Sequence, residues 1–275
     1  MKRSSTNRGD LRQARRESLR ALRILALLIV LFLVALGSWR EHVRSTQWRV
    51  PLFVAVYPIA ADASPVTRGY IGRLDAQRFT DIDRFFAAQA HAHGVQIEVP
   101  LKTRLQPPLD ALPPVREPGA GALATMWWSL KLRFWAWRQT RGAHEPADVR
   151  MFVLYHDPAD NESVPHSAGL LKGMIGVVHA FARTDMDGGN SMVIAHEIMH
   201  TLGATDKYDP NSDAPQFPHG YGDPRQMPLY PQRSAELMGG RLALSATQWE
   251  QPDGLDQCVV GELTAREIRW SEHAP

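Results

Sequence analysis

Cysteine is almost absent from this sequence, since Cys258 is the only one among 275 residues. One cysteine excludes an intrachain disulfide and a zinc site built from cysteine ligands. The folded part must therefore be stable without cross-links, although an extracytoplasmic location stays open. We expect Cys258 to be a small buried core residue, because free cysteine is among the most buried residue types.

Positive charge is scarce outside the N-terminal segment. Of the 31 Lys and Arg residues, eight lie in residues 1–23, which hold only two of the 29 acidic residues. The remainder therefore carries 23 basic and 27 acidic residues. It lacks the basic surplus typical of nucleic-acid binding, so we expect no nucleic-acid partner. Internal repeats and low-complexity tracts are also absent.

Long apolar runs are absent except for one near the N-terminus, over residues 24–36. Extended to residues 21–39, it has about the length that spans the hydrocarbon of a bilayer. Arg23 can reach the headgroups on one side, and Trp39 suits the other interface. The alternative is a cleaved signal peptide, but the run is long for one and Ala35-Leu36-Gly37 is a poor cleavage site.

The basic excess before this run predicts its orientation. By the positive-inside rule, residues 1–20 form a cytoplasmic tail and residues 21–39 form a transmembrane helix that acts as a signal anchor. Residues 45–275 then form one domain in the periplasm or outside the cell. The lipid bilayer is thus a predicted partner through residues 21–39.

The domain is predicted to have an α+β fold, with a mixed sheet backed by helices. Apolar periodicity indicates strands and helices in the order strand, helix, strand, helix, strand, strand, helix. Their predicted bounds are residues 48–57, 75–93, 95–105, 123–141, 149–155, 173–181 and 191–202. Asn190 or Ser191 can cap the last helix. Residues 207–233 are rich in Pro, Gly and Asp, which predicts a long loop that is either functional or disordered.

The last helix carries the pattern H-E-x-x-H-x-x-G-x-x-D, from His196 to Asp206. Histidines four residues apart lie on one face of a helix, so His196 and His200 can bind one metal ion. Gly203 can end the helix in a sharp turn that brings Asp206 back as a third ligand. Three protein ligands beside an open position predict a catalytic zinc site, with Glu197 as the general base.

This pattern resembles the motif of the metzincin metallopeptidases, which ends in His instead of Asp. With Asp206 in the last place and Tyr208 two residues later, it is most similar to the snapalysin-type branch, and also similar to the immune-inhibitor-A type. The resemblance covers about residues 190–240. It implies zinc, an active-site cleft and an edge strand that aligns the substrate. Residues 173–181 stand at the place in the chain expected for that strand.

A second resemblance lies 38 residues after His200, where residues 235–240 read Ala-Glu-Leu-Met-Gly-Gly. They resemble the methionine turn that lies below the metal in metzincins, with Met238 as its methionine. Some metzincins have a metal-facing Tyr two residues after that methionine, but Gly240 stands here. The transition-state role therefore stays open between three tyrosines, namely Tyr208, Tyr221 and Tyr230.

The motif and the resemblance together predict a membrane-anchored zinc endopeptidase that acts on a peptide or protein substrate. Glu197 would take a proton from water and pass it to the leaving amine. One alternative is a hydrolase of cell-wall cross-bridges or another amide. The other is a non-catalytic metal-binding domain that binds a partner at the membrane. The presence of Glu197 disfavours the non-catalytic domain, because a purely structural metal site does not need a general base.

Several further residues have two interpretations. His219 is an alternative third ligand, although the spacing favours Asp206. Three loop carboxylates could bind calcium, but the absence of EF-hand spacing favours solvated side chains for Asp209, Asp213 and Asp223. His179 could face the substrate, although a lone strand histidine is usually structural. The aromatic helix over 123–141 is either a core helix with basic residues on its wet face or an element lying on the bilayer, and the first is favoured.

Overall fold

The computed structural model describes residues 48–116, 119, 121–142, 146–161, 163–165, 167–170 and 174–271. The chain divides into two units, Met1–Val43 and Arg44–Pro275, and the described residues all belong to the second. The predicted cytoplasmic tail and transmembrane helix, residues 1–20 and 21–39, lie outside the described residues. Among the residues that are described, no helix has both the length and the apolar character needed to cross a bilayer.

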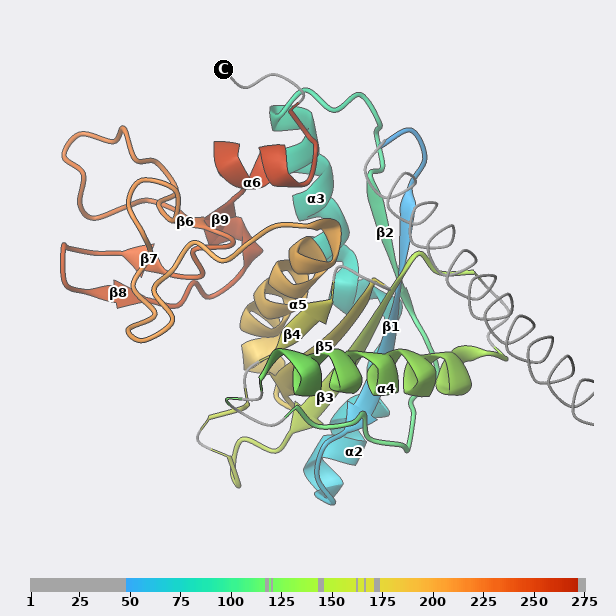
Figure 1. Ribbon diagram of the computed structural model, residues 1–275. Helices are drawn as coiled ribbons and strands as arrows, with labels where there is room; N and C mark the ends of the chain where they lie inside the picture. Colours follow the sequence, from blue (N-terminus) through green and yellow to red (C-terminus); the bar gives the residue numbers. More distant parts are fainter. Residues whose placement is uncertain are drawn as a thin grey trace, which may run out of the picture. The chain divides into compact units, whose positions relative to one another are not determined.

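A five-stranded mixed sheet lies at the centre of the domain (Figure 1). Its strands are β1 (Leu52–Ala60), β2 (Leu101–Leu105), β3 (Val149–His156), β4 (Ala168–Leu170) and β5 (Ile175–Phe181). The order is β2-β1-β3-β5-β4, in which the first four are parallel and β4 runs antiparallel to β5. The prediction of a mixed sheet is therefore confirmed. The inner strands β1 and β3 and the neighbouring β5 are mostly apolar because helices cover both of their faces, whereas β2 alternates apolar and polar residues.

The helices form a layer on each face of the sheet (Figure 1). One layer holds α2 (Pro65–Ile71), α3 (Thr80–Ala92) and α5 (Asp187–Leu202), and the other holds α4 (Ala122–Thr140). Alternate residues of a strand point to opposite faces. Accordingly Val54 and Val56 pack in the core with α3 and α5, while Ala55 and Tyr57 pack with α4.

Three predicted elements have other bounds than expected. Over residues 95–105 only β2 forms, because β1 begins at Leu52 and offers partners from Leu101 onward. The last predicted helix begins at Asp187, so Asn190 lies inside α5 and does not cap it. Asn190 instead accepts from the backbone N–H of Phe181 and donates to its carbonyl oxygen, which fixes α5 against the end of β5. Over residues 75–93, η1 (Ala76–Phe79) precedes α3.

The edge of the sheet differs from the prediction. Residues 173–181 were expected to supply the edge strand, but β5 lies between β3 and β4, and β4 forms the edge. Three residues are too short for an alternating apolar pattern, so the sequence carries no signal for β4. The short helix α2 was also not predicted, although Ser64 and Pro65 are a typical cap and first residue of a helix.

The aromatic helix α4 carries large apolar side chains on two opposite sides. Trp128, Leu132 and Ala136 pack on the sheet, as expected for a core helix. Trp127 and Trp137 lie on the opposite side and are exposed. The prediction of a core helix is thus confirmed for one face of α4 only.

The chain after α5 is mostly irregular. As predicted, residues 207–233 contain no helix or strand. The remaining elements are small and comprise β6 (Ala235–Glu236), β7 (Leu242–Ala243), β8 (Trp249–Glu250), η3 (Leu255–Gln257), β9 (Cys258–Val259) and α6 (Glu262–Glu267), with η2 (Thr184–Met186) before α5. β6 pairs with β9, and Cys258 is buried as expected.

Candidate metal centre

The helix α5 ends where the sequence predicts. Gly203 adopts φ +112°, a left-handed conformation that disfavours any residue with a Cβ. Its N–H donates to the carbonyl oxygen of His200, and that of Ala204 donates to Met199, which closes the helix. The chain then reverses and carries Asp206 back past the last turn of α5. The turn therefore places a carboxylate beside two helical histidines.

Three ligand-type atoms meet at this turn. Oδ1 of Asp206 lies 3.2 Å from Nε2 of His196 and 3.1 Å from Nε2 of His200. The two rings stand almost perpendicular, with centroids 4.7 Å apart. His196, Glu197 and His200 form the group that could hold a metal ion among the described residues, with ligand atoms within 4.8 Å of one another.

The outer ring nitrogens fix the tautomer of each histidine. Nδ1 of His196 lies 3.0 Å from the carbonyl oxygen of Leu237, and Nδ1 of His200 lies 2.9 Å from that of Ala204. A carbonyl oxygen can only accept, so each Nδ1 carries the proton. Each Nε2 faces Oδ1 of Asp206, and it presents a lone pair whenever the ring is neutral. This is the arrangement in which neutral imidazoles bind metals.

The charges at this point favour a cation. Burial raises the pKa of Asp206, but the hydrogen bonds with His196 and His200 outweigh it and hold the pKa well below its usual range. Burial lowers the pKa of His200, yet the bond to Asp206 and the charge of Glu197 raise it overall. The same two carboxylates that favour a proton on His200 also favour a divalent cation between the rings.

Glu197 is buried to 5% exposure, and its Oε2 is a buried atom without a hydrogen-bond partner among the described residues. Burial raises the pKa of its carboxyl, while the neighbouring histidines and the N–H of Gly169 act in the opposite direction. A Cβ at position 169 would lie only 2.6 Å from the carbonyl oxygen of Glu197. Glycine therefore permits the edge strand β4 to pass directly over α5 at this carboxylate.

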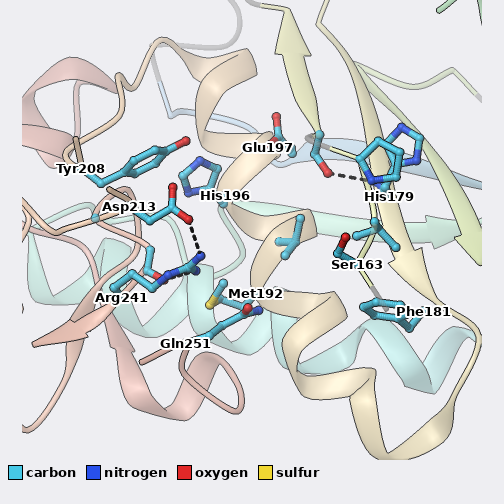
Figure 2. A pocket seen from close by; sticks show the side chains of 16 residues that line it. Ser163, His179, Phe181, Met192, His196, Glu197, Tyr208, Asp213, Arg241 and Gln251 are labelled. Atoms are coloured by element: carbon cyan, nitrogen blue, oxygen red, sulfur yellow. Dashed lines mark hydrogen bonds and ion pairs between the residues drawn. The ribbon is translucent and has the colours of Figure 1, made fainter. Parts of the chain in front are cut away.

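A cavity of about 530 Å³ opens beside the group (Figure 2). His196, Glu197 and Tyr208 line one side, and Asp213 and Arg241 continue it. Arg241 donates to Asp213 at 3.2 Å. The rest of the wall comes from β5, α5, the chain before β4 and the C-terminal segment, namely Ser163, Val164, Pro165, Ser167, His179, Phe181, Met192, Val193, Gly239, Gly240 and Gln251.

The segment resembling a methionine turn packs against His196 and supplies the acceptor of its Nδ1. Met238 is fully buried, and its carbonyl oxygen accepts from the N–H of Lys207. Gly240 adopts φ +66° and donates to the carbonyl oxygen of Glu236, which closes the turn. The carbonyl that holds His196 belongs to Leu237 in this turn.

Glu236 is a site residue that the sequence analysis missed. It is fully buried, and three donors converge on its two carboxylate oxygens. Oε2 accepts from the N–H of Gly239 at 2.8 Å, while Oε1 accepts from the N–H of Gly261 at 3.0 Å and the hydroxyl of Thr264 at 2.7 Å. Glu236 thus ties the turn to the start of α6. A charged residue inside the otherwise apolar Ala235–Met238 stretch was the available signal.

The three candidate tyrosines lie in different places. Tyr208 lines the cavity, with its ring centroid 6.3 Å from that of His196. Burial and the carboxylates of Asp206 and Glu197 raise its pKa to about 12, so its hydroxyl keeps its proton. Tyr221 and Tyr230 instead bond to each other at 2.9 Å and are not part of the cavity wall.

The remaining candidate ligands in the loop over residues 207–233 do not gather at one site. His219 is exposed and lies outside the cavity wall. Asp209 accepts from the N–H groups of Asn211 and Ser212, and Asp223 accepts from that of Arg225, as turn carboxylates do. Asp213 is paired with Arg241. The three carboxylates therefore serve different local partners.

His179 lies in the cavity wall and is not a lone histidine. Its Nδ1 lies 2.9 Å from Nε2 of His156, on the neighbouring strand β3. Burial, and then the proximity of His156, lowers the pKa of His179 to about 4. The wall opposite the metal group therefore presents a neutral ring at neutral pH.

No protein-family model and no curated protein matches the chain. Among solved structures, it is similar to a chaperone–substrate complex at 13% identity and a TM-score of 0.38, over 81% of this chain and 35% of that one. It is also similar to wild-type OgpA from Akkermansia muciniphila at 12% identity and a TM-score of 0.35, over 81% and 62%. The chain thus spans about a third of the first protein and less than two thirds of the second.

Similarities at this level carry no argument about function. The fold and the site themselves define a mixed α/β protein in which His196, Glu197 and His200 form a group that could hold a metal ion.

Proposed function

We propose that this protein is a zinc-dependent endopeptidase of metzincin type. One observation carries the proposal: Nε2 of His196, Nε2 of His200 and Oδ1 of Asp206 meet at one point, beside the buried carboxylate of Glu197. A purely structural site would not need a general base at that point.

The donor set suits zinc. Zinc in proteins takes imidazole nitrogens and carboxylate oxygens, and catalytic sites use three protein ligands with one open position. His196, His200 and Asp206 supply such a set, and both outer ring nitrogens are already bonded to carbonyl oxygens. Oε2 of Glu197 has no hydrogen-bond partner among the described residues, which further supports a metal-bound water beside it, because buried carboxylate oxygens are usually hydrogen-bonded.

When bound, zinc supplies Lewis-acid polarisation of a carbonyl group and a water molecule of lowered pKa. The chain's own residues perform the remaining steps. Glu197 takes a proton from the attacking water, for which its raised pKa and desolvated position suit it. It then passes that proton to the leaving nitrogen. The protonated hydroxyl of Tyr208 is the candidate donor to the developing oxyanion.

An extended peptide is the substrate that the surroundings of Glu197 favour. In the described sheet, β4 pairs with β5 on one side only, so its other edge is available to a further strand. Gly169 in β4 donates to Glu197, so a peptide added to this edge would pass the proposed base. The cavity of about 530 Å³ beside it has room for a substrate side chain.

The sequence adds a location to this proposal. Residues 21–39 are proposed to anchor the enzyme, with residues 1–20 in the cytoplasm and the catalytic domain in the periplasm or outside the cell.

The proposal is tested by metal analysis of the purified full-length protein, followed by digestion of an untargeted peptide library. We expect about one zinc per chain and internal cleavage of peptides that stops on chelation. Glu197→Gln should keep the zinc and lower the cleavage rate by about a thousandfold. Glu262→Gln is the matched control, because Glu262 is exposed on α6, and it should cleave normally.

Two results would remove the proposal. Zinc binding with no cleavage of the library by the parent protein would favour a non-catalytic domain or a hydrolase of other amides. Full activity in Glu197→Gln would show that this carboxylate is not the base.

A further inference from the structure

The outer face of α4 is an exposed apolar surface that the metal centre does not explain. Its inner face is already used, since Trp128, Leu132 and Ala136 are buried against the sheet. The outer face nevertheless consists of large apolar side chains at steps of three and four residues, namely Leu123, Met126, Trp127, Leu130, Phe134 and Trp137. Steps of this kind place them along one side of the helix.

These side chains are well exposed. Leu123 is 78% exposed, Phe134 63% and Trp127 61%. A contiguous exposed apolar stripe of this kind marks a surface that meets another apolar phase or partner. It lies on the opposite side of the sheet from the metal helix α5, so the peptidase chemistry does not account for it (Figure 1).

The charges beside the stripe are all positive. From Ala122 to Gly142 the sequence has four basic residues and no Asp or Glu. Lys131 and Arg138 are exposed on one flank of the stripe, at helical positions adjacent to Trp127 and Phe134. The guanidinium of Arg141 lies over the ring of Trp137, at 5.8 Å. Lys and Arg beside Trp, Phe and Leu are typical of helices that lie in the headgroup region of a bilayer.

The chain before the domain indicates which apolar phase is near. Residues 24–36 are a continuous apolar run, and only residues 40–47 separate Trp39 from the first described residue, Trp48. Eight residues reach at most about 28 Å. If residues 21–39 span a bilayer, as the sequence predicts, the domain is held within that reach of its surface.

We infer that the outer face of α4 is a membrane-docking surface, which lies in the outer headgroup region of the bilayer with Trp127, Leu130 and Phe134 below the phosphates. Lys131 and Arg138 meet the anionic lipid headgroups. The helix α5, which carries the metal group, then lies on the face of the sheet that is turned away from the bilayer. This inference rests on the anchor proposed for residues 21–39 but not on the proposed peptidase chemistry, because no metal or catalytic residue takes part.

Spin labelling of the full-length protein in bilayer nanodiscs of phosphatidylcholine and phosphatidylglycerol tests the inference. Single cysteines replace Leu130 and Phe134, which are exposed, and Met227 serves as the control because it is 90% exposed in the loop over 207–233. Unsubstituted protein is the labelling blank, since Cys258 is buried. Collision rates of each nitroxide with oxygen, which enriches in hydrocarbon, and with a polar nickel chelate are measured.

We expect the ratio of oxygen to nickel collisions to be severalfold higher at 130 and 134 than at 227. Exchanging Lys131 and Arg138 for Glu should lower the ratio at 130 while circular dichroism stays unchanged. Equal ratios at all three positions would overturn the inference, because α4 would then face water. Suppression of both collision rates at 130 and 134 would also overturn it, since a second copy, the N-terminal segment or another protein would then cover the stripe.

Discussion

Nδ1 of His196 lies 3.0 Å from the carbonyl oxygen of Leu237, which comes 41 positions later in the chain. This hydrogen bond fixes the ring of the first motif histidine from below. The carbonyl in turn depends on the turn around Met238, which Glu236 ties to Gly261 and Thr264. Glu236 thus holds the turn that carries the acceptor of this ring, although its carboxylate does not bond to the ring itself.

Replacement of Glu236 by Gln should weaken both the fold and the metal group. The amide keeps the shape but sets an NH2 group against a backbone donor, which leaves buried polar atoms unpaired. We expect the free energy of unfolding to fall by about 2 kcal/mol. Zinc affinity should fall by about 10- to 100-fold, since the acceptor of His196 shifts. Urea unfolding and competition with a chelating dye measure the two effects.

Thr264→Val is the matched control for this prediction. It removes one of the three donors to Glu236, leaves the carboxylate in place and should cost less than Glu236→Gln in both measurements. A Glu236→Gln protein that unfolds more easily but binds zinc with unchanged affinity would show that the turn does not position His196.

Comparing Asp206→Asn with Asp223→Asn distinguishes a metal ligand from an ordinary loop carboxylate. Asp206→Asn should lower zinc affinity by more than about a hundredfold, because loss of a direct ligand exceeds the effect of an outer partner. Asp223→Asn should leave the affinity unchanged, since that side chain only accepts from a turn N–H. Zinc titration in the presence of a competing chelator gives both values. Tight binding in Asp206→Asn would point to another third ligand, with Glu197 as the first to test, because its carboxylate lies within 4.8 Å of the ligand atoms of both histidines.

Tyr208→Phe tests the proposed donor to the oxyanion. Loss of a donor that acts only in the transition state lowers kcat by about 10²- to 10³-fold and leaves KM and zinc content unchanged. Tyr230→Phe removes a hydroxyl that bonds to Tyr221, outside the cavity wall, and should cleave at the normal rate. If Tyr208→Phe instead lost zinc, the hydroxyl would act through Asp206 and not on the substrate.

Glu267 should make the domain sensitive to acid. Although burial raises its pKa, hydrogen bonds from Lys207 and Thr205 outweigh this effect and lower the pKa below its ordinary value of 4.5. A folded-state pKa below the unfolded one contributes stability that is complete above about pH 4.5 and is lost as the pH falls through the folded-state value. Lys207 is itself 4% exposed, and Glu267 is the carboxylate that bonds to its ammonium, beside two oxygens of Thr205.

Comparison of the parent protein with Glu267→Gln by urea unfolding from pH 7 to pH 3.5 measures this contribution. The variant should be about 3 kcal/mol less stable at pH 7, and the difference should shrink at the acid end. Glu262→Gln is the control, since its ion pair with Arg225 is exposed and worth little. A Glu267→Gln deficit that stays constant with pH would mean that the charge of Glu267 is not its cause.

The parts of the fold that the sequence predicted are those with a long or local signal. Helices α3 and α4 and strands β1, β3 and β5 follow from apolar periodicity over seven residues or more. Strand β4 has three residues, and the pairs β6–β9 and β7–β8 have two per strand. Strands this short form only because a partner strand supplies hydrogen bonds, so no residue pattern along the chain predicts them.

The sequence by itself determined the local geometry of the metal group. A helical repeat places His196 and His200 on one face, and a glycine at the helix end returns Asp206 within a few residues. Contacts this close in sequence depend on backbone conformation alone.

Only the tertiary structure decided what surrounds that group. The acceptor of His196, the two partners of Glu236 near α6 and the strand that passes over Glu197 come from segments between 25 and 41 positions away. The exposed face of α4 belongs to the same class, because burial of one apolar face and exposure of the other depends on which side meets the sheet. Contacts between distant segments arise from packing in three dimensions, and the sequence of either segment alone does not contain them.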